Sequence, residues 1–204
     1  MGVLANFPII TITREYGAGG RSLARALSKK YDIPWHDADI VKLASDISGY
    51  TEEEIEAEGQ ELSKLDRALD WMLNSSVAYT SSRDQIYKAQ AESILELAKE
   101  PCIFISRCSN IILRNAGVPS FDIFLYADLE KRVERAKELR EHGEENIHEY
   151  MKKRDNLRKI YYETYTKKKF GDCDDYDMFI NTGLLKYEDY ADLIDISIKN
   201  KYGL

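Results

Sequence analysis

Five short runs of apolar and β-branched residues are spread along the chain, and each has the composition and length of a buried strand. The first reads Pro-Ile-Ile-Thr-Ile-Thr and stops at a cluster of glycines, which indicates a strand followed by a tight turn. Because stretches of helical character separate the runs, they predict parallel strands of an α/β protein. The runs cover residues 8–13, 33–36, 102–106, 121–126 and 178–181.

The stretches between these runs place apolar residues at helical spacing. Leu23, Leu27 and Tyr31 share one face of a helix that follows the glycine cluster. Thr51 and Glu54 have the spacing of a capping box at the start of a long polar, largely helical stretch. Further helices are predicted over residues 39–48, 83–99, 128–141 and 187–202.

The segment 143–177 differs from the rest of the chain. It is rich in Lys, Arg and Tyr, and its only β-like features are weak. It lies between the fourth and fifth predicted strands, where a lid over a phosphate site could be inserted.

Composition narrows the class of protein. Of 204 residues, 44% are hydrophobic and 32% are charged, so we expect residues 1–204 to form a single globular domain. Acidic residues outnumber basic residues 36 to 29, which gives a net charge of −7. This balance argues against a broad nucleic-acid surface, although a local basic pocket can still bind a small anion.

The cysteines and the apolar stretches indicate the compartment. Cys102, Cys108 and Cys173 lack the close spacing of a zinc or redox motif, so we expect reduced thiols. No apolar stretch approaches the roughly 18 residues that span a bilayer, and residues 1–6 lack the features of a signal peptide. We therefore expect a cytoplasmic protein with no nucleic-acid and no membrane partner.

The glycine cluster has the features of a phosphate-binding loop. Glycines tolerate unusual dihedral angles and leave the amide groups bare, and the helix that follows adds its N-terminal dipole. A hydroxyl just after the loop, that of Ser22, can bind Mg²⁺ beside the phosphates. The alternative is a turn that binds nothing. The predicted ATP phosphate-binding residues are Gly17, Ala18, Gly19, Gly20, Arg21 and Ser22.

The run from Ile12 to Arg21, I-T-R-E-Y-G-A-G-G-R, resembles the opening of the cytidylate kinase-like family, whose pattern is close to I-S-R-E-[YF]-G-S-G-G-R. Other segments agree in order and spacing, including Ile33-Pro-Trp-His-Asp37, Arg154-Asp-Asn-Leu-Arg-Lys-Ile-Tyr-Tyr162 and Tyr176-Asp-Met-Phe-Ile-Asn-Thr182. The resemblance implies a three-layer α/β/α P-loop fold with a five-stranded parallel sheet in the order 2-3-1-4-5. It also implies a helical acceptor-binding insertion at about 46–82 and a lid at about 143–175.

The chain departs from true cytidylate kinases at two places. Their loop reads G-P-S-G-A-G-K-G-T, and a gapless comparison puts Gly20 in the place of the lysine and Ser22 in that of the threonine. The pattern G-x-x-x-x-G-K-[ST] instead puts Arg21 in the place of the lysine, so the cation must come from Arg21 or from elsewhere. The second departure is Ser106-Arg107-Cys108, where true cytidylate kinases carry Gly-Arg-Asp.

The resemblance also implies roles for residues outside the loop. Arg154 and Arg158 share a face if their segment is helical, and they would close on the phosphates. Asp155 beside them would orient one guanidinium or bind a hydroxyl of the acceptor. The alternative is a solvated basic helix. Arg107 would contact the acceptor, or it is a surface arginine at a strand end. Asp37 would begin the acceptor site, or it caps the next helix.

The activity implied by the resemblance is transfer of the γ-phosphoryl group of ATP to CMP or dCMP with Mg²⁺. Arg21, Arg154 and Arg158 would offset the charge that develops on the phosphoryl group. Arg67 and Arg83 in the insertion are candidates for the acceptor phosphate. The alternatives are a kinase for another nucleotide or small metabolite and a nucleotide-binding regulator without catalysis. The acceptor and the choice between monomer and homodimer stay open.

Overall fold

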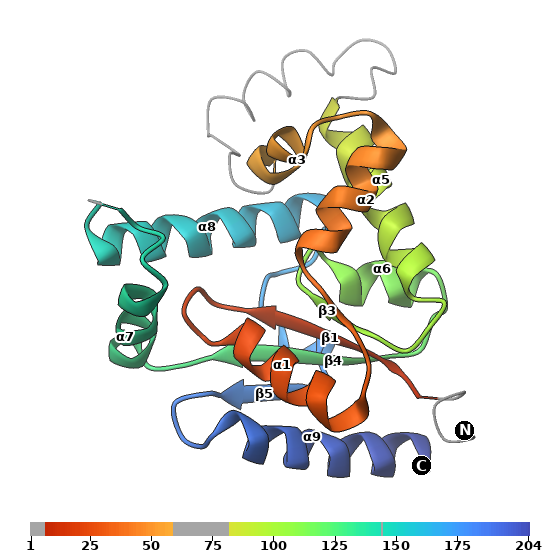
Figure 1. Cartoon of the computed structure of the whole chain (residues 1–204), viewed down its shortest axis with the longest axis vertical. Helices are drawn as coiled ribbons and strands as arrows, with labels where there is room; N and C mark the ends of the chain where they lie inside the picture. The colour runs from red at the N-terminus through yellow and green to blue at the C-terminus, as the bar shows by residue number, and fades with distance from the viewer. Residues whose placement is uncertain (1–6, 59–81, 144) are drawn as a thin grey trace.

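The computed structural model describes residues 7–58, 82–143 and 145–204 and contains a five-stranded parallel sheet (Figure 1). The strand order is β2-β3-β1-β4-β5, as the resemblance implied. All five strands fall on the predicted apolar runs, with ends that differ by one or two residues. The strands are β1 (Ile9–Arg14), β2 (Trp35–His36), β3 (Ile103–Ile105), β4 (Ser120–Tyr126) and β5 (Met178–Asn181).

Helices connect the strands and cover both faces of the sheet. None of the described helices is long and apolar enough to cross a membrane. They are α1 (Gly20–Tyr31), α2 (Ala38–Ser48), α3 (Glu52–Glu58), α5 (Ser82–Leu97), α6 (Ser109–Asn115), α7 (Leu129–Leu139), α8 (Ile147–Thr166) and α9 (Tyr187–Tyr202), with a 3₁₀ turn η2 at Cys173–Asp175.

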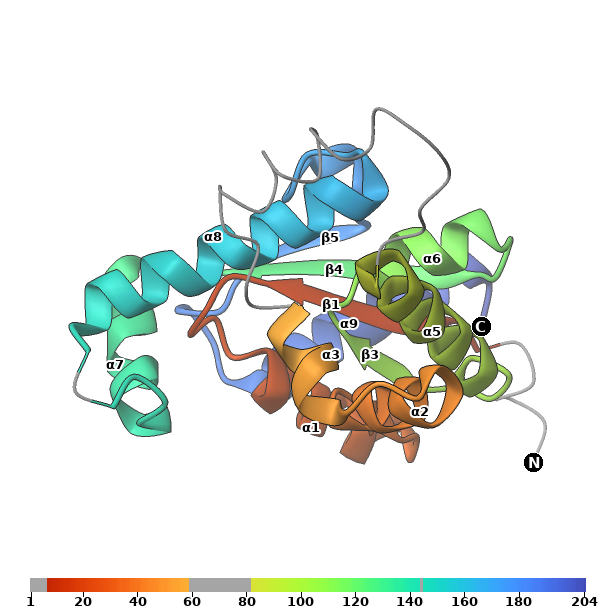
Figure 2. The same ribbon diagram turned by 90° about the horizontal axis from the view of Figure 1, so that it is seen from above.

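Successive residues of β1 face opposite sides of the sheet, and each side has its own core. Ile10 and Ile12 pack with residues of α1 and α9. On the other face Ile9 and Phe104 pack with residues of α6 and α8. Figure 2 shows the sheet with α8 on one side and α1 on the other. The predicted three-layer α/β/α arrangement is therefore confirmed.

The strand order reverses between β1 and β3. The chain leaves β1 toward β2, and later it crosses from β3 to β4 on the other side of β1. In open α/β sheets ligands bind beyond the carboxyl ends of the strands at such a point. Arg14 ends β1 there, and Ser106 and Arg107 follow β3.

The predicted insertion at about 46–82 begins in the last turn of α2 and includes α3. The helices α2, α3 and α5 pack through a small core of their own. The capping box is confirmed, since the Thr51 amide donates to Glu54 Oε2 at 2.7 Å and the Glu54 amide donates to Thr51 Oγ1 at 3.2 Å. Residues 59–81 are outside the described residues, and Arg67 lies among them.

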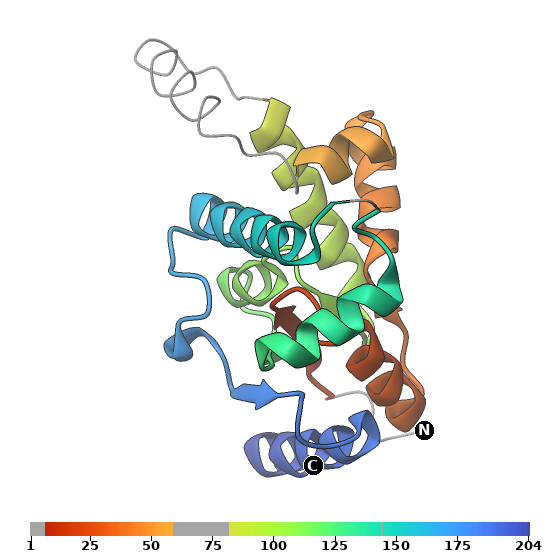
Figure 3. The same cartoon turned by 90° about the vertical axis from the view of Figure 1, so that its left-hand side faces the viewer.

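The predicted lid is dominated by α8, a single helix of 20 residues that lies next to α7 (Figure 3). The side chain of Asn146 caps this helix by accepting hydrogen bonds from the amides of His148 and Glu149. The weak β-like features of the segment are not realised, because Tyr161 and Tyr162 are buried against the sheet from a helical backbone. The short helix α6 was not predicted.

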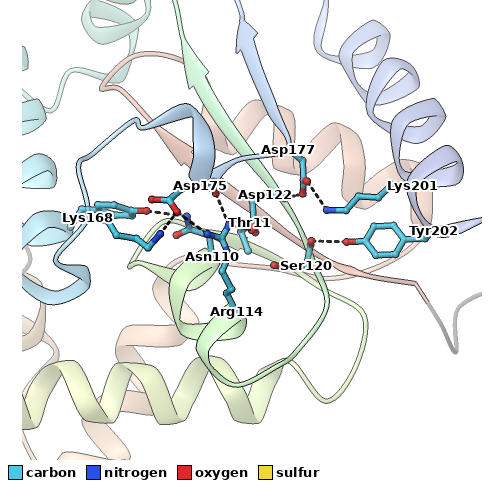
Figure 4. Close-up of polar contacts among 11 residues, drawn as sticks. Thr11, Asn110, Arg114, Ser120, Asp122, Lys168, Asp175, Asp177, Lys201 and Tyr202 are labelled. Atoms are coloured by element: carbon cyan, nitrogen blue, oxygen red, sulfur yellow. Dashed lines mark hydrogen bonds and ion pairs between the residues drawn. The ribbon is translucent and has the colours of Figure 1, made fainter.

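A polar network joins β1, β4 and α6 to the chain that follows α8 (Figure 4). Thr11 Oγ1 donates to Asp122 Oδ1 at 2.6 Å, and Arg114 reaches Asp122 Oδ2 at 3.4 Å. Arg114 also donates to Asp175 Oδ1 at 2.7 Å, and Lys168 pairs with the same carboxylate. We call Thr11, Arg114, Asp122, Lys168 and Asp175 the anchor network, because they attach the end of the lid to the sheet.

Candidate functional site

A cavity of about 580 Å³ lies at the carboxyl ends of β1 and β3, between the glycine loop, the start of α2 and the helices α7 and α8. Guanidinium groups from several elements converge on it, and such a cluster attracts anions. The arginines that line it are Arg14, Arg21, Arg107, Arg135, Arg154 and Arg158, and the acidic residues are Glu15, Asp37, Glu56, Glu138 and Glu141.

Two glycines of the loop have a backbone that only glycine adopts readily. The φ angles are 76° at Gly17 and 83° at Gly19. A Cβ at Gly17 would lie 2.6 Å from the carbonyl oxygen of Arg132, and a Cβ at Gly19 would lie 2.0 Å from the hydroxyl oxygen of Tyr187. The sequence therefore has glycine where the loop packs directly against its neighbours.

The loop is held in place from α7 and from the end of β5. Thr182 Oγ1 donates to the carbonyl oxygen of Ala18 at 2.8 Å, and the Ala18 amide donates to the carbonyl of Glu15 at 3.2 Å. Arg135 donates to the carbonyl oxygen of Gly17 at 3.4 Å. The contacts from Thr182 and Arg135 use carbonyl oxygens of the loop, so they hold the loop without occupying its amide groups.

The first turn of α1 supplies further donors. Helix geometry leaves the amides of Gly20, Arg21 and Ser22 without a partner inside the helix. Gly19 at the N-cap offers no side-chain cap, and the first turn contains no acidic residue. This helix start has the donors that an anion requires.

Arg21 and Asp37 form an ion pair at the mouth of the cavity. Arg21 Nε donates to Asp37 Oδ2 at 2.9 Å, and Arg21 Nη1 lies 3.5 Å from Glu141 Oε1. Burial alone would raise the pKa of Asp37, but the charges of Arg14 and Arg21 outweigh it and hold the pKa below its usual value. Asp37 occupies the N-cap position of α2, but its side chain accepts no hydrogen bond from the first turn of the helix. Its carboxylate instead lines the cavity.

The turn after β3 is strained. Ser106, Arg107 and Cys108 have φ angles of 64°, 58° and 58°, a left-handed conformation that is rare for residues with a side chain. The turn places Arg107 on the cavity wall, and its buried Nε has no hydrogen-bond partner among the described residues. Strain of this kind is concentrated at functional sites.

The helix α8 brings two more arginines to the cavity, as predicted. Arg154 lies over the ring of Tyr150 at 5.8 Å, and Arg158 lies over the ring of Tyr16 at 5.3 Å. Burial lowers the pKa of Arg158, and Arg154 adds to this, although Asp155 opposes it. The buried Arg158 Nη1 has no hydrogen-bond partner in the described part of the chain. The interpretation of this segment as a solvated basic helix is therefore wrong.

Asp155 does not line the cavity. Its carboxylate accepts hydrogen bonds from the amide of Tyr16 at 2.5 Å and from Arg132 at 2.7 Å, which docks α8 onto the glycine loop. Asp155 also lies 3.7 Å from Nη1 of Arg158, so it orients guanidinium groups, one of the two roles expected of it, and it positions the loop and the lid. Its role as an acceptor ligand stays a prediction.

Tyrosines of α8 attach the helix to the core. Tyr161 is buried and donates to Gln90 at 2.6 Å, and Tyr162 accepts from Asn110 at 3.2 Å. Tyr165 stacks on Tyr87 with ring centroids 4.3 Å apart. These contacts favour a packing role for the three tyrosines over stacking on a base.

The sequence analysis missed Arg14, which ends β1 and lines the cavity. Burial lowers the pKa of Arg14 to about 9, and repulsion from Arg158 adds to this, so the guanidinium is charged at neutral pH. A signal was present in the sequence, because the arginine belongs to the I-T-R-E-Y-G run that carries the resemblance.

A family model described as the cytidylate kinase-like family matches residues 9–184. This range spans the five strands, the glycine loop and α8. No curated protein matches the chain.

Solved structures resemble the chain over almost its whole length. An uncharacterized protein from Eubacterium ventriosum has 26% sequence identity and a TM-score of 0.64, with 94% of this chain and 98% of that one covered. A shikimate kinase from Bacteroides thetaiotaomicron has 13% identity and a TM-score of 0.55, with 97% of this chain and 99% of that one covered. A gluconokinase from Sinorhizobium meliloti has 12% identity and a TM-score of 0.51, covering 97% and 94%. The two kinases are similar in fold and confirm the P-loop kinase architecture.

Proposed function

The chain belongs to the cytidylate kinase-like family, and we propose that it transfers the γ-phosphoryl group of ATP to a nucleoside monophosphate, with CMP or dCMP as the acceptor. The observation that carries this proposal is the arginine-lined cavity at the glycine loop. In it the buried Arg107 Nε and Arg158 Nη1 have no hydrogen-bond partner among the described residues. Buried donors of this kind require an acceptor, and phosphate oxygens would provide it.

The donor phosphates would lie on the glycine loop. The amides of residues 17–22 and the dipole of α1 would hold them. The amide of Ala18 already donates to the carbonyl of Glu15, so the buried Ala18 contributes mainly to the close packing of the loop. Ser22 lines the same cavity, and its hydroxyl is a hard oxygen donor of the kind that Mg²⁺ prefers, so this residue fits a magnesium ion. When bound, the ion would neutralise charge on the donor phosphates.

The acceptor would lie in the same cavity, near Asp37 and Arg107. An acceptor phosphate oxygen attacks the γ-phosphorus, and the electron pair of the bond between the β–γ bridging oxygen and the γ-phosphorus leaves with ADP. Arg154 and Arg158 would offset the charge on the transferring group, and Arg21 would do so if its pairs with Asp37 and Glu141 open. No covalent enzyme intermediate is needed.

A kinase for a small metabolite is the second candidate. The observation that favours it is Cys108, a buried thiol at the position where true cytidylate kinases carry an acid after the arginine. The structural likeness to a shikimate kinase and a gluconokinase suggests which non-nucleotide acceptors to include in an assay.

The test is ADP production from ATP and Mg²⁺ with each nucleoside monophosphate in turn, with shikimate and gluconate, and without acceptor. The proposal expects strong turnover with CMP or dCMP and little without acceptor. Turnover with a non-nucleotide acceptor only would support the second candidate. ATP binding without turnover for any acceptor would contradict both and support a nucleotide-binding regulator.

A further inference from the structure

Gly20 is a glycine for a different reason from Gly17 and Gly19. Its φ angle is not in the left-handed region, so its backbone conformation does not require glycine. The space above it is already filled, because a Cβ at Gly20 would lie 3.1 Å from Cδ and 3.3 Å from Nε of Arg14. A side chain at position 20 and the side chain of Arg14 therefore compete for the same volume.

Position 20 is where the gapless comparison with true cytidylate kinases places the phosphate-binding lysine. That lysine starts from the first turn of the helix and reaches the β- and γ-phosphates of the donor. Arg14 starts instead from the last residue of β1 and passes over Gly20 into the cavity. The guanidinium of Arg14 thus reaches the space above position 20 from the end of β1, whereas the lysine reaches it from the helix.

Arg14 has no counterion of its own. Among the described residues, the guanidinium of Arg14 forms no ion pair and donates no hydrogen bond. Asp37 is the acidic group that attracts it, but Arg21 already holds that carboxylate at 2.9 Å. A partly buried cation without a partner is costly for the folded state. Its presence is explained by an anionic ligand.

We propose that Arg14 binds the β- and γ-phosphates of the donor and supplies the positive charge that position 20 lacks. The inference rests on the proposed function and names the residue that completes its donor site. Arg14 stabilises the transferring group as a fixed charge and exchanges no proton, while the electron pair of the broken bond leaves with ADP. Arg21, which is 58% exposed and paired with Asp37 and Glu141, is the less suitable cation.

The experiment compares Arg14→Met, Arg14→Lys, Arg14→Ala and the double variant Arg14→Ala/Gly20→Lys with the wild type. ATP affinity is measured by calorimetry, turnover with the best acceptor by ADP production, and stability by urea unfolding without ligand. Arg25→Ala is the matched control, since Arg25 is an exposed arginine on α1 outside the cavity.

We expect Arg14→Met to lower kcat/KM by about 10²–10³-fold, the usual effect of removing one donor to a transition-state oxyanion. The same variant should be at least as stable as the wild type without ligand, because it removes an unpaired, partly buried charge. Arg14→Lys should retain part of the activity. The double variant should recover at least about tenfold over Arg14→Ala, because a lysine can enter the vacated space.

Two results would overturn the inference while leaving the proposed function intact. One is ATP affinity and turnover in Arg14→Met within twofold of the wild type. The other is loss of stability in Arg14→Met together with unchanged ATP affinity, which would make Arg14 structural. If the wild type turns over no acceptor, ATP affinity alone tests Arg14. If the wild type binds neither ATP nor inorganic tripolyphosphate, the proposed function and the inference both fail.

Discussion

The cavity and the anchor network are both charged regions in the interior of the protein, but their groups are satisfied differently. In the anchor network every carboxylate meets a donor, and Asp175 alone is paired with both Arg114 and Lys168. In the cavity Arg14 has no ion pair among the described residues, and donors of Arg107 and Arg158 lack hydrogen-bond partners there. The first arrangement is complete within the chain, whereas the second is completed by a ligand.

The pKa shifts follow the same division. Burial raises the pKa of Asp122 in the anchor network, although the Thr11 hydrogen bond and Arg114 oppose this. In the cavity the surplus of guanidinium groups lowers the pKa of Asp37 despite its burial. The ratio of partners to charges, more than the number of charges, therefore distinguishes a structural cluster from a binding site.

The largest effect is expected from Arg158→Ala. It removes a donor that faces the transferring group, so kcat/KM should fall by about 10²–10³-fold while the stability of the unliganded protein changes little. Lys159→Ala, an exposed neighbour on α8, is the control and should change kcat/KM less than twofold. Equal losses in the two variants, or an unfolded Arg158→Ala, would place Arg158 with the structural groups.

The counterpart in the anchor network is Asp175→Ala. It leaves Arg114 and Lys168 without their shared carboxylate, so the free energy of unfolding should fall by about 2–3 kcal/mol. This loss is smaller than for a fully buried ion pair, because solvent screens the two partly exposed cations. The affinity for ATP should stay unchanged. Urea unfolding and calorimetry check the two expectations, with the exposed Asp174→Ala as control. If the variant kept its stability and lost ATP affinity, the anchor network would act in ligand binding and would not be a purely structural cluster.

A smaller effect, dependent on pH, is expected from Asp37→Asn. Because the folded-state pKa lies below the unfolded value near 3.8, Asp37 contributes stability above that pH and loses the contribution as the pH falls through the folded value. The variant should cost about 1.5 kcal/mol at pH 7, and the difference from the wild type should shrink below pH 3.8. Urea unfolding between pH 7 and pH 3 measures it, with Asp46→Asn on the exposed face of α2 as control. A cost independent of pH would mean that the charge of Asp37 is not the cause.

The smallest effect is expected from Ser106→Gly. Glycine adopts the φ of 64° without strain, so the variant should gain about 0.5–1 kcal/mol of unfolding free energy. Thermal unfolding measures the gain. A loss of stability would show that the left-handed turn before Arg107 is not strained. Backbone strain would then not be a property in which the cavity differs from the anchor network.

Much of the fold could be predicted because it follows from local patterns. The β-branched runs predicted all five strands, and the capping box at Thr51 was predicted from two residues three positions apart. The helix α6 was missed because it is short and begins with the buried polar residues Ser109 and Asn110, which give no amphipathic pattern. The division into a single domain and the assembly as monomer or homodimer stay predictions.

The residues of the candidate site that act through their own backbone could be predicted from the residue type, whereas side chains such as those of Arg154 and Arg158 were predicted from the family resemblance. Gly17 and Gly19 were found because the need for a positive φ is a property of the residue itself. Asp155 was assigned to the acceptor because its neighbours are arginines, but the docking of α8 turns it toward Tyr16 and Arg132. Arg14 was missed because it reads as the last residue of a strand, and its relation to Gly20 depends on the path of its side chain.

The sequence by itself determined the strand–loop–helix order, the glycines of the loop and the family, since each depends on residues close together in the chain. Only the tertiary structure decided which charges meet. The Thr11–Asp122 hydrogen bond joins residues 111 positions apart, and the contact of Tyr16 with Asp155 joins residues 139 apart. Such pairings are important because a charged group that is removed from water costs free energy unless a group of opposite charge or a hydrogen-bond partner lies beside it. Tertiary contacts or a bound ligand supply that partner.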